Sequence, residues 1–141
     1  MEDIELARSL LEEDKWNLVI VKKGRILFDS RERGIGPFFQ AVQSGKRNLH
    51  NAAVADRVVG SAVAMLCLHA RVRYVYAATL SQGAFDMLKK DGVAVDCMNL
   101  VPHISNYDGT DLCPFEKLAE SCDNPSQLMT ALQSFFAKGD R

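Results

Sequence analysis

The chain has 141 residues, of which 48% are hydrophobic, and this size and composition are typical of one folded domain rather than of a disordered protein. The longest nearly apolar run, Val58 to Leu68, is too short to span a bilayer, and the acidic start at residues 2–5 is unlike a basic export signal. We therefore expect a cytoplasmic protein without a membrane segment. The formal net charge of −1 conceals a segregation: residues 1–14 carry −5, residues 15–73 carry +8 and residues 74–141 carry −4.

Hydrophobic periodicity and turn residues predict an alternation of helices and strands. In the first half of the chain we expect a helix at 2–13, strands at 16–21 and 26–28 joined by a hairpin turn, a helix at 37–43, a strand at 51–55 and an apolar helix from Val58 to Ala70. In the second half we expect a strand at 73–78, a helix from Ser81 to Lys90, a strand at 93–98 that residues 101–104 extend or follow, and helices beginning at Pro114 and Pro125. A hairpin followed by such alternation predicts a mixed sheet in a layered α/β domain.

The loop from Asn106 to Cys113 concentrates chemically active side chains immediately before a helix. Proline is favoured at the first helical position, so Pro114 makes Cys113 the expected N-cap. A thiol at a helix N-terminus is stabilised as thiolate, which makes Cys113 a candidate nucleophile with Asp111 or His103 as its base. The alternative is turn chemistry, because Asp108-Gly109-Thr110 is a natural turn sequence.

Three runs, at residues 30–35, 54–60 and 108–114, are similar to motifs of an uncharacterised prokaryotic family of domains of unknown function. The resemblance covers about residues 15–122, between an N-terminal helix at 1–14 and a C-terminal helix at 123–141. It implies a variant of the cytidine-deaminase fold, a three-layer α/β/α domain with a mixed central sheet. It implies no particular reaction.

The residues at the expected zinc positions differ from those of true deaminases. Those enzymes carry a His or Cys and a Glu at the start of one core helix, and a Pro-Cys-x-x-Cys at the start of the next. Here the corresponding runs are 55–58, Ala-Asp-Arg-Val, and 80–84, Leu-Ser-Gln-Gly-Ala. We therefore expect no metal, no cofactor and no zinc-dependent deamination. A zinc site built from Cys97, His103, Cys113 and Cys122 is the alternative, although its spacing matches no known pattern.

The leading hypothesis is a site for a small anionic ligand such as a nucleotide, placed at the strand ends near the helices that follow Asp56 and Ser81. Arg31 and Arg33 flank Glu32. The two arginines would clamp a phosphate, or alternatively would form a surface ion-pair cluster with Glu32. Asp56 is either a helix N-cap or a ligand contact, and Arg57 would add positive charge. The full set of expected ligand-binding residues is Ser30, Arg31, Arg33, Asp56, Arg57, Ser81, Asn106, Asp108 and Thr110, with Cys113 and Asp111 as candidate catalytic residues.

Other functions remain open from the sequence. One is an enzyme that uses Cys113 as its nucleophile. Another is a homo-oligomeric interaction module that uses the terminal helices. Nucleic-acid binding is disfavoured because aromatic residues are 8% of the chain and do not alternate with basic ones.

Overall fold

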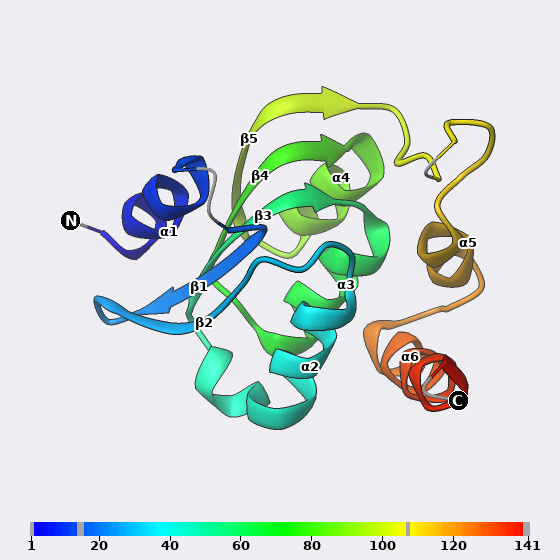
Figure 1. Cartoon of the computed structure of the whole chain (residues 1–141), viewed down its shortest axis with the longest axis horizontal. Coiled ribbons are helices and arrows are strands. Elements are labelled where there is room, and N and C mark those ends of the chain that lie inside the picture. Colours follow the sequence, from blue (N-terminus) through cyan, green and yellow to red (C-terminus); the bar gives the residue numbers. More distant parts are fainter. Residues whose placement is uncertain (1, 14–15, 107, 140–141) are drawn as a thin grey trace.

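The computed structural model of the protein describes residues 2–13, 16–106 and 108–139. Five strands form one sheet in the order β2-β1-β3-β4-β5 (Figure 1). The strands are β1 (Leu18–Lys22), β2 (Arg25–Ser30), β3 (Ala53–Val59), β4 (Tyr74–Ser81) and β5 (Ala94–Val101). The first two pair antiparallel with each other, and β1 also pairs antiparallel with β3. The pairs β3–β4 and β4–β5 are parallel, so the sheet is mixed, as the sequence predicts.

The hairpin turn follows from two left-handed residues. Lys23 has a φ of 53° and Gly24 a φ of 76°, which is the backbone of a two-residue turn whose twist matches that of the flanking strands. The side chain of Asp3 accepts hydrogen bonds from both of these N–H groups, at 2.8 Å each. The start of the first helix is thereby tied to the turn.

Helices cover the two faces of the sheet unequally (Figure 1). Helix α1 (Asp3–Glu12) packs on one face, where Ala7 and Leu11 meet Val19, Val21 and Tyr76 in a small core. The main core lies on the other face, beneath α2 (Gly36–Gly45), α3 (Ser61–Ala70) and α4 (Gln82–Lys90). None of the helices in the described part of the chain has both the length and the apolar character that a membrane span requires.

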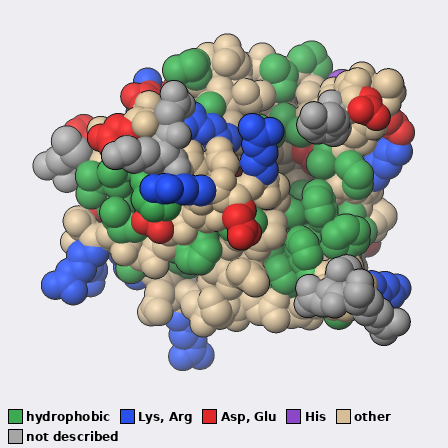
Figure 2. Space-filling model, viewed as in Figure 1, with side chains coloured by type: hydrophobic (Ala, Val, Ile, Leu, Met, Phe, Trp, Pro, Cys, Tyr) green, Lys and Arg blue, Asp and Glu red, His purple; other side chains and the backbone are tan. Residues whose placement is uncertain are grey.

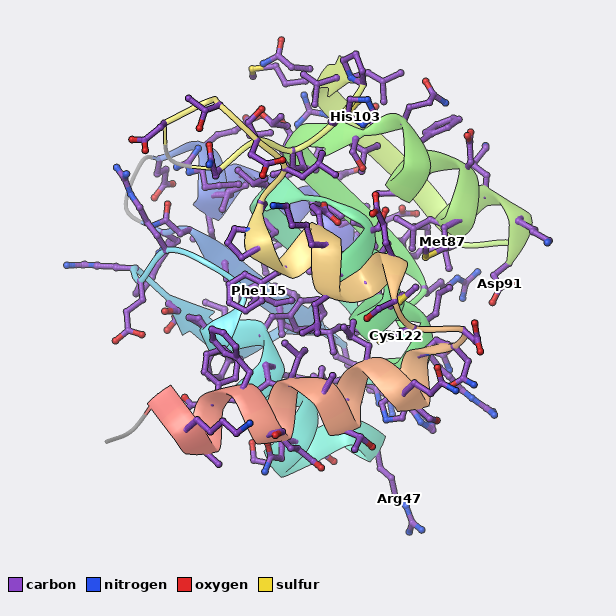
Figure 3. All side chains as sticks on the ribbon, turned by 90° about the vertical axis from the view of Figure 1, so that its right-hand side faces the viewer. Arg47, Met87, Asp91, His103, Phe115 and Cys122 are labelled. Atoms are coloured by element: carbon purple, nitrogen blue, oxygen red, sulfur yellow. The ribbon has the colours of Figure 1, made fainter. Side chains whose placement is uncertain are left out.

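Two further helices, α5 (Pro114–Glu120) and α6 (Pro125–Gly139), pack outside α3. Aromatic rings hold them in place. The Phe136 ring stacks on Phe39 of α2, with centroids 5.1 Å apart, and on Phe115 of α5, at 6.1 Å. Phe135 contacts both Phe115 and Phe136 edge-on. Figure 3 shows Phe115 directed inward between these helices.

The boundaries around β3 correct the sequence prediction. The strand continues through Asp56 and Arg57 to Val59, and α3 begins at Ser61 rather than at Val58. Asp56 is therefore a strand residue and not a helix N-cap. The β-branched pair Val58-Val59 favours the extended backbone, so the strand ends at Gly60 rather than at Asp56. A short 3-10 helix at Lys46–Leu49 was not predicted, and β4 and β5 each extend three residues beyond their expected ends.

The packing of α6 generates a test of whether this helix belongs to the folded unit. Leu132 is 0% exposed in the main core, whereas Leu27 on β2 is 41% exposed. Leu132→Ala should lower the free energy of unfolding by about 2–5 kcal/mol because it leaves a cavity, and Leu27→Ala by less than about 1 kcal/mol. Equilibrium urea unfolding measures both. Equal, small effects would mean that α6 contributes little to the stability of the fold.

Candidate functional site

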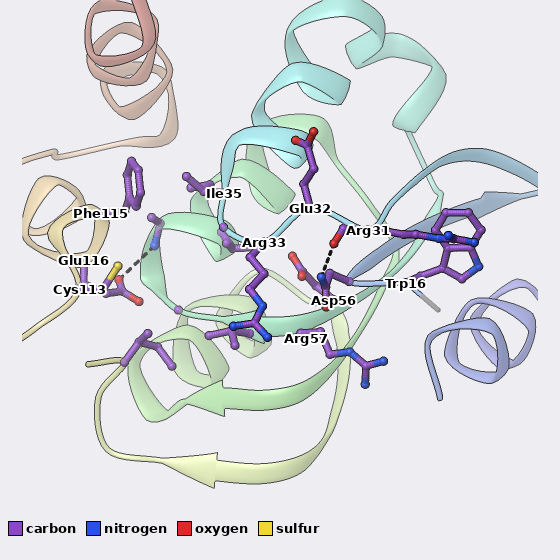
Figure 4. Close-up of a pocket in the computed structure, with 17 residues that line it drawn as sticks. Trp16, Arg31, Glu32, Arg33, Ile35, Asp56, Arg57, Cys113, Phe115 and Glu116 are labelled. Atoms are coloured by element: carbon purple, nitrogen blue, oxygen red, sulfur yellow. Dashed lines mark hydrogen bonds between the residues drawn. The ribbon is translucent and has the colours of Figure 1, made fainter. Parts of the chain in front are cut away.

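A cavity of about 870 Å³ opens beside the end of β3, on the face that carries α3 and α5 (Figure 4). All three of the sequence runs that carry the family resemblance contribute to its wall. The lining residues are Trp16, Asn17, Arg31, Glu32, Arg33, Gly34, Ile35, Asp56, Arg57, Val58, Gly60, Ala62, Val63, Ile104, Cys113, Phe115 and Glu116. On the face shown in Figure 2, basic side chains lie on one side of this region and a broad hydrophobic surface on the other.

Asp56 is a buried carboxyl in the wall of the cavity. Its side chain is on the α3 face of β3, because Val54, two residues earlier, belongs to the main core. Only 8% of the residue is exposed, and this burial raises its pKa from the usual 3.8 to about 7. The N–H groups of Arg57 and Val58 and the charge of Arg57 oppose that rise. Asp56 therefore changes charge near neutral pH.

Arg57 points the other way and has a structural role. Its Nη2 donates a hydrogen bond to the carbonyl oxygen of Leu11 at 2.6 Å, in the last turn of α1. A cation is favoured there by the negative end of the helix dipole. Figure 4 shows the guanidinium directed toward α1, although the residue borders the cavity. Arg57 lies within β3 and not at the helix N-terminus that was expected, and its role as an anion ligand stays a prediction.

The two remaining arginines differ in their surroundings. The Arg31 guanidinium lies 5.0 Å from the centre of the Trp16 ring, and its backbone oxygen accepts a hydrogen bond from Asn17 Nδ2 at 2.6 Å. Arg33 extends into the open space of the cavity (Figure 4) and makes no hydrogen bond or ion pair with any described residue. Neither arginine forms an ion pair with Glu32 among the described residues, so the expected surface cluster is absent there.

Glu116 reaches from α5 to the start of α3. Its Oε1 accepts a hydrogen bond from Ser61 N at 2.9 Å, and its Oε2 accepts one from Ala62 N at 3.3 Å. The carboxylate thus caps another helix across 54 residues of sequence. Burial raises the pKa of Glu116, and the two N–H donors oppose this. Gly60 makes the approach possible, because a Cβ there would lie 1.4 Å from Glu116 Oε1.

Cys113 is the N-cap of α5, as the sequence predicts, and it lines the cavity. Its side chain makes no capping hydrogen bond. The proposed base is elsewhere: Asp111 forms an ion pair with Lys117 and accepts a hydrogen bond from Leu112 N at 2.7 Å. Lys117 lowers the pKa of Asp111. His103 is exposed and is not among the residues that line the cavity.

The other expected ligand-binding residues lie outside the cavity wall. Ser81 caps α4 by accepting a hydrogen bond from Ala84 N at 3.1 Å. Ser30 Oγ accepts one from Glu32 N, and Asn106 Oδ1 accepts one from Thr110 N at 3.0 Å. Asp108 is exposed in the same turn. Asn106 and Thr110 thus bond to each other, and Tyr107 lies outside the described residues.

Several wall residues were not predicted, chiefly Trp16, Asn17, Ile35, Val63, Phe115 and Glu116. Of these residues, only Glu116 has a signal in the sequence, because it follows Pro114 by two positions. An acidic residue at that position is expected to stabilise the start of its own helix, whereas the Glu116 carboxylate caps α3. Within the described residues, no group of three or more His, Cys, Asp or Glu side chains is arranged to hold a metal ion.

Comparisons with known proteins identify relatives without an assigned activity. A family model described as a domain of unknown function, DUF1893, matches residues 6–136. The crystal structure of a DUF1893 family protein from Thermotoga maritima is similar to this structure, with a TM-score of 0.84 and 25% sequence identity over 94% of this chain and 88% of that chain. No curated protein matches. Function must therefore be argued from the cavity.

The contact between Gly60 and Glu116 is testable by a double-mutant cycle. Gly60→Ala should destabilise the protein by about 1–3 kcal/mol because the new methyl group displaces the Glu116 carboxylate. Glu116→Ala should cost about 1–2 kcal/mol through loss of the cap. The double variant should lose less unfolding free energy than the sum of the two single losses, because the alanine at position 60 then meets no carboxylate. Gly45→Ala is the control, because its Cβ would meet no atom closer than 3.7 Å. Additive losses would contradict the contact.

The raised pKa of Asp56 predicts a pH-dependent stability difference. The neutral carboxyl is favoured in the folded state, so its contribution is present in acid and is lost as pH rises from about 4 to about 7. Asp56→Asn cannot ionise. Its advantage over the wild type should grow from near zero at about pH 4 to roughly 2–4 kcal/mol at about pH 8. Unfolding at a series of pH values measures this, with exposed Asp91→Asn as the control (Figure 3). A difference that does not change with pH would contradict it.

Proposed function

Because the chain belongs to the DUF1893 family, whose function is unknown, we propose its function from the cavity: it binds a small anionic ligand of the nucleotide class. One observation carries this proposal. The three family-like runs converge on a cavity that combines free positive charge, apolar walls and one buried carboxyl. Those three properties match three features of a nucleotide, which are its phosphate, the apolar faces of its flat base and the polar edge of that base.

The placement of charge supports one orientation of the ligand. Asp56 and Glu116 are buried carboxyl groups in the wall, so a phosphate placed beside them would be repelled. Arg31 and Arg33 are exposed and lie where the chain leaves β2. The phosphate therefore belongs at the arginines. A guanidinium holds phosphate oxygens with two parallel hydrogen bonds, and Arg33 extends into the cavity with this capacity unused among the described residues.

The inner part of the cavity suits the ring. Ile35, Val63 and Phe115 supply apolar surface, and Asp56 supplies a hydrogen-bonding group beside it. An ionised Asp56 accepts hydrogen bonds from ring N–H or amino groups, and a protonated one donates to a ring nitrogen or carbonyl. Such a ligand would set the charge state of Asp56, since hydrogen bonds to one form of the carboxyl favour that form.

We also propose that the fold is the cytidine-deaminase fold in a variant that does not hold zinc. The order of elements from β1 to β5 agrees with the order that the resemblance implies. At the start of α3 the described residues are Gly60, Ser61 and Ala62, with Glu116 bonded to them, and at the start of α4 they are Ser81, Gln82 and Gly83. None of these offers the thiolate or imidazole ligands on which zinc-dependent deamination relies.

A second candidate function has one observation in its favour. Cys113 is a partly exposed thiol in the wall of the same cavity, so a ligand bound there would meet a potential nucleophile. It lacks the base that was expected, because Asp111 is bonded to Lys117. The cysteine enzyme therefore has a weaker structural basis than ligand binding.

Removing the arginine that extends into the cavity tests the proposal. Binding of AMP, GMP, CMP and UMP is measured by calorimetry and by the shift in melting temperature. Arg33→Ala should weaken the binding of whichever nucleotide binds by about 1–3 kcal/mol, the value of a charge-assisted hydrogen bond. Arg47→Ala, whose side chain projects into solvent away from the cavity (Figure 3), should leave affinity unchanged.

Two results would contradict the proposal. One is the absence of any melting-temperature shift with all four nucleotides at millimolar concentration. The other is an equal loss of affinity in Arg33→Ala and Arg47→Ala, which would indicate a non-specific response to net charge. Inorganic phosphate serves as a further comparison, because it lacks the ring and should bind more weakly than a nucleotide.

A further inference from the structure

Strand β5 forms an open edge of the sheet (Figure 1). Its inner side pairs with β4 along its whole length, and no strand of the described residues pairs with its outer side. Met98 is 63% exposed and Leu100 is 50% exposed, the two largest exposures among the large hydrophobic residues of the described chain. Hydrophobic side chains are visible in Figure 2 along the top of the molecule, where β5 runs. An open strand with apolar side chains is a template for pairing with another chain.

The opposite edge of the sheet is protected in the usual ways, and β5 is not. Edge strands are commonly protected by basic residues, prolines or bulges. Strand β2 carries Arg25 and Asp29, and its pairing with β1 contains a register shift. Strand β5 has no Lys, Arg or Pro in its eight residues. Its one charge, Asp96, lies 3.5 Å from Arg8 of the same chain. The contrast within one sheet indicates that β5 is kept open for a partner.

We propose that this partner is a second copy of the chain, whose β5 pairs antiparallel with β5 about a two-fold axis at Asn99. Residues directly opposite in an antiparallel pair share a face of the sheet, so such an axis must pass through a residue. With the axis at Asn99, Met98 meets Leu100 of the second copy and Cys97 meets Val101. Apolar residues then pair on both faces, and the two Asn99 amides meet at the axis, where each can donate and accept a hydrogen bond.

The two registers with the axis at Cys97 or Met98 are worse because of Asp96. An axis at Cys97 would place Met98 against Asp96 of the second copy, and an axis at Met98 would place Leu100 against it. Both registers would place the Asp96 carboxylate against an apolar side chain and would remove water from the charged group, which is unfavourable. With the axis at Asn99, Asp96 falls opposite Pro102 at the end of the pair and stays beside Arg8. An axis at Leu100 would place Asn99 against Val101, a polar side chain against an apolar one. Of these four registers, only the one with its axis at Asn99 pairs apolar residues on both faces.

The size of the contact sets how tight the dimer is. A pair of eight-residue edge strands is a small interface, below the area of a standard stable complex, so the dimer should form in the micromolar range and dissociate on dilution. No residue of β5 lines the cavity. The two cavities therefore stay open in the dimer, and the proposal is independent of what the cavity binds.

Sedimentation velocity of the full chain over a concentration series tests the dimer. The wild type should show a concentration-dependent dimer, and Leu100→Lys or Met98→Lys should raise its dissociation constant at least tenfold. Leu27→Lys on β2 is the matched control, since Leu27 is 41% exposed on the other edge, and it should dimerise like the wild type. Both variant positions on β5 are exposed, so the variants should stay folded, which circular dichroism checks.

Cysteine crosslinking tests the register. Asn99→Cys places a thiol against its own copy at the axis and should form a covalent dimer under mild oxidation, whereas Ala94→Cys on the same strand should not. A wild type that is monomeric at all concentrations would overturn the proposal, including the case in which β5 binds an extended segment of another protein. A dimer that persists in both lysine variants, or that crosslinks equally at 94 and 99, would overturn it too.

Discussion

The fold around the cavity depends on one contact, the Glu116 carboxylate at the first N–H groups of α3. The start of a helix leaves backbone donors without partners inside the helix, and these donors attract negative charge. Here the charge comes from another helix of the same chain. The contact fixes the position of α5 against α3, and with it the positions of Cys113 and Phe115 in the cavity wall. It also occupies two donors at the start of α3 that an anionic ligand could otherwise use, which is why the proposed phosphate site is placed at the arginines of the 31–35 segment.

This contact constrains the sequence at three separate positions. Residue 60 has to be glycine because any side chain would enter the space of the carboxylate. Pro114 begins α5 and so sets which residue falls on the helix face that meets α3. The phenylalanine contacts of Phe39, Phe115 and Phe136 press α5 and α6 onto the core, which keeps the carboxylate buried. The buried carboxylate is stabilised by its two N–H donors and opposed by desolvation, and the raised pKa shows that desolvation is the larger effect.

Local signals in the sequence predict the elements well where one short segment decides the structure. The hairpin follows from a Lys-Gly turn, and the start of α5 follows from Pro114, so both agree with the prediction. The prediction fails where a distant partner decides. Asp56 and Arg57 read as the end of a strand because they are charged, yet Arg57 is held by the carbonyl of Leu11 and Asp56 faces a cavity. Convergence of the three family-like runs could not be derived from spacing. Asn106 and Thr110 bond to each other, which short-range spacing alone does not reveal, and their role as ligand contacts stays a prediction.

The conflict between stability and charge at Asp56 bears most directly on function. Its carboxyl is buried, and ionisation near neutral pH disfavours the folded state. An asparagine or an apolar residue would avoid this penalty in the same strand, and proteins retain such penalties mainly at functional sites. Arg57 next to it has a structural explanation at the end of α1, whereas Asp56 has none in the packing of the core. A buried carboxyl whose ionisation costs stability, in a cavity that Arg33 also enters without a bond to any described residue, is what the proposed ligand site requires.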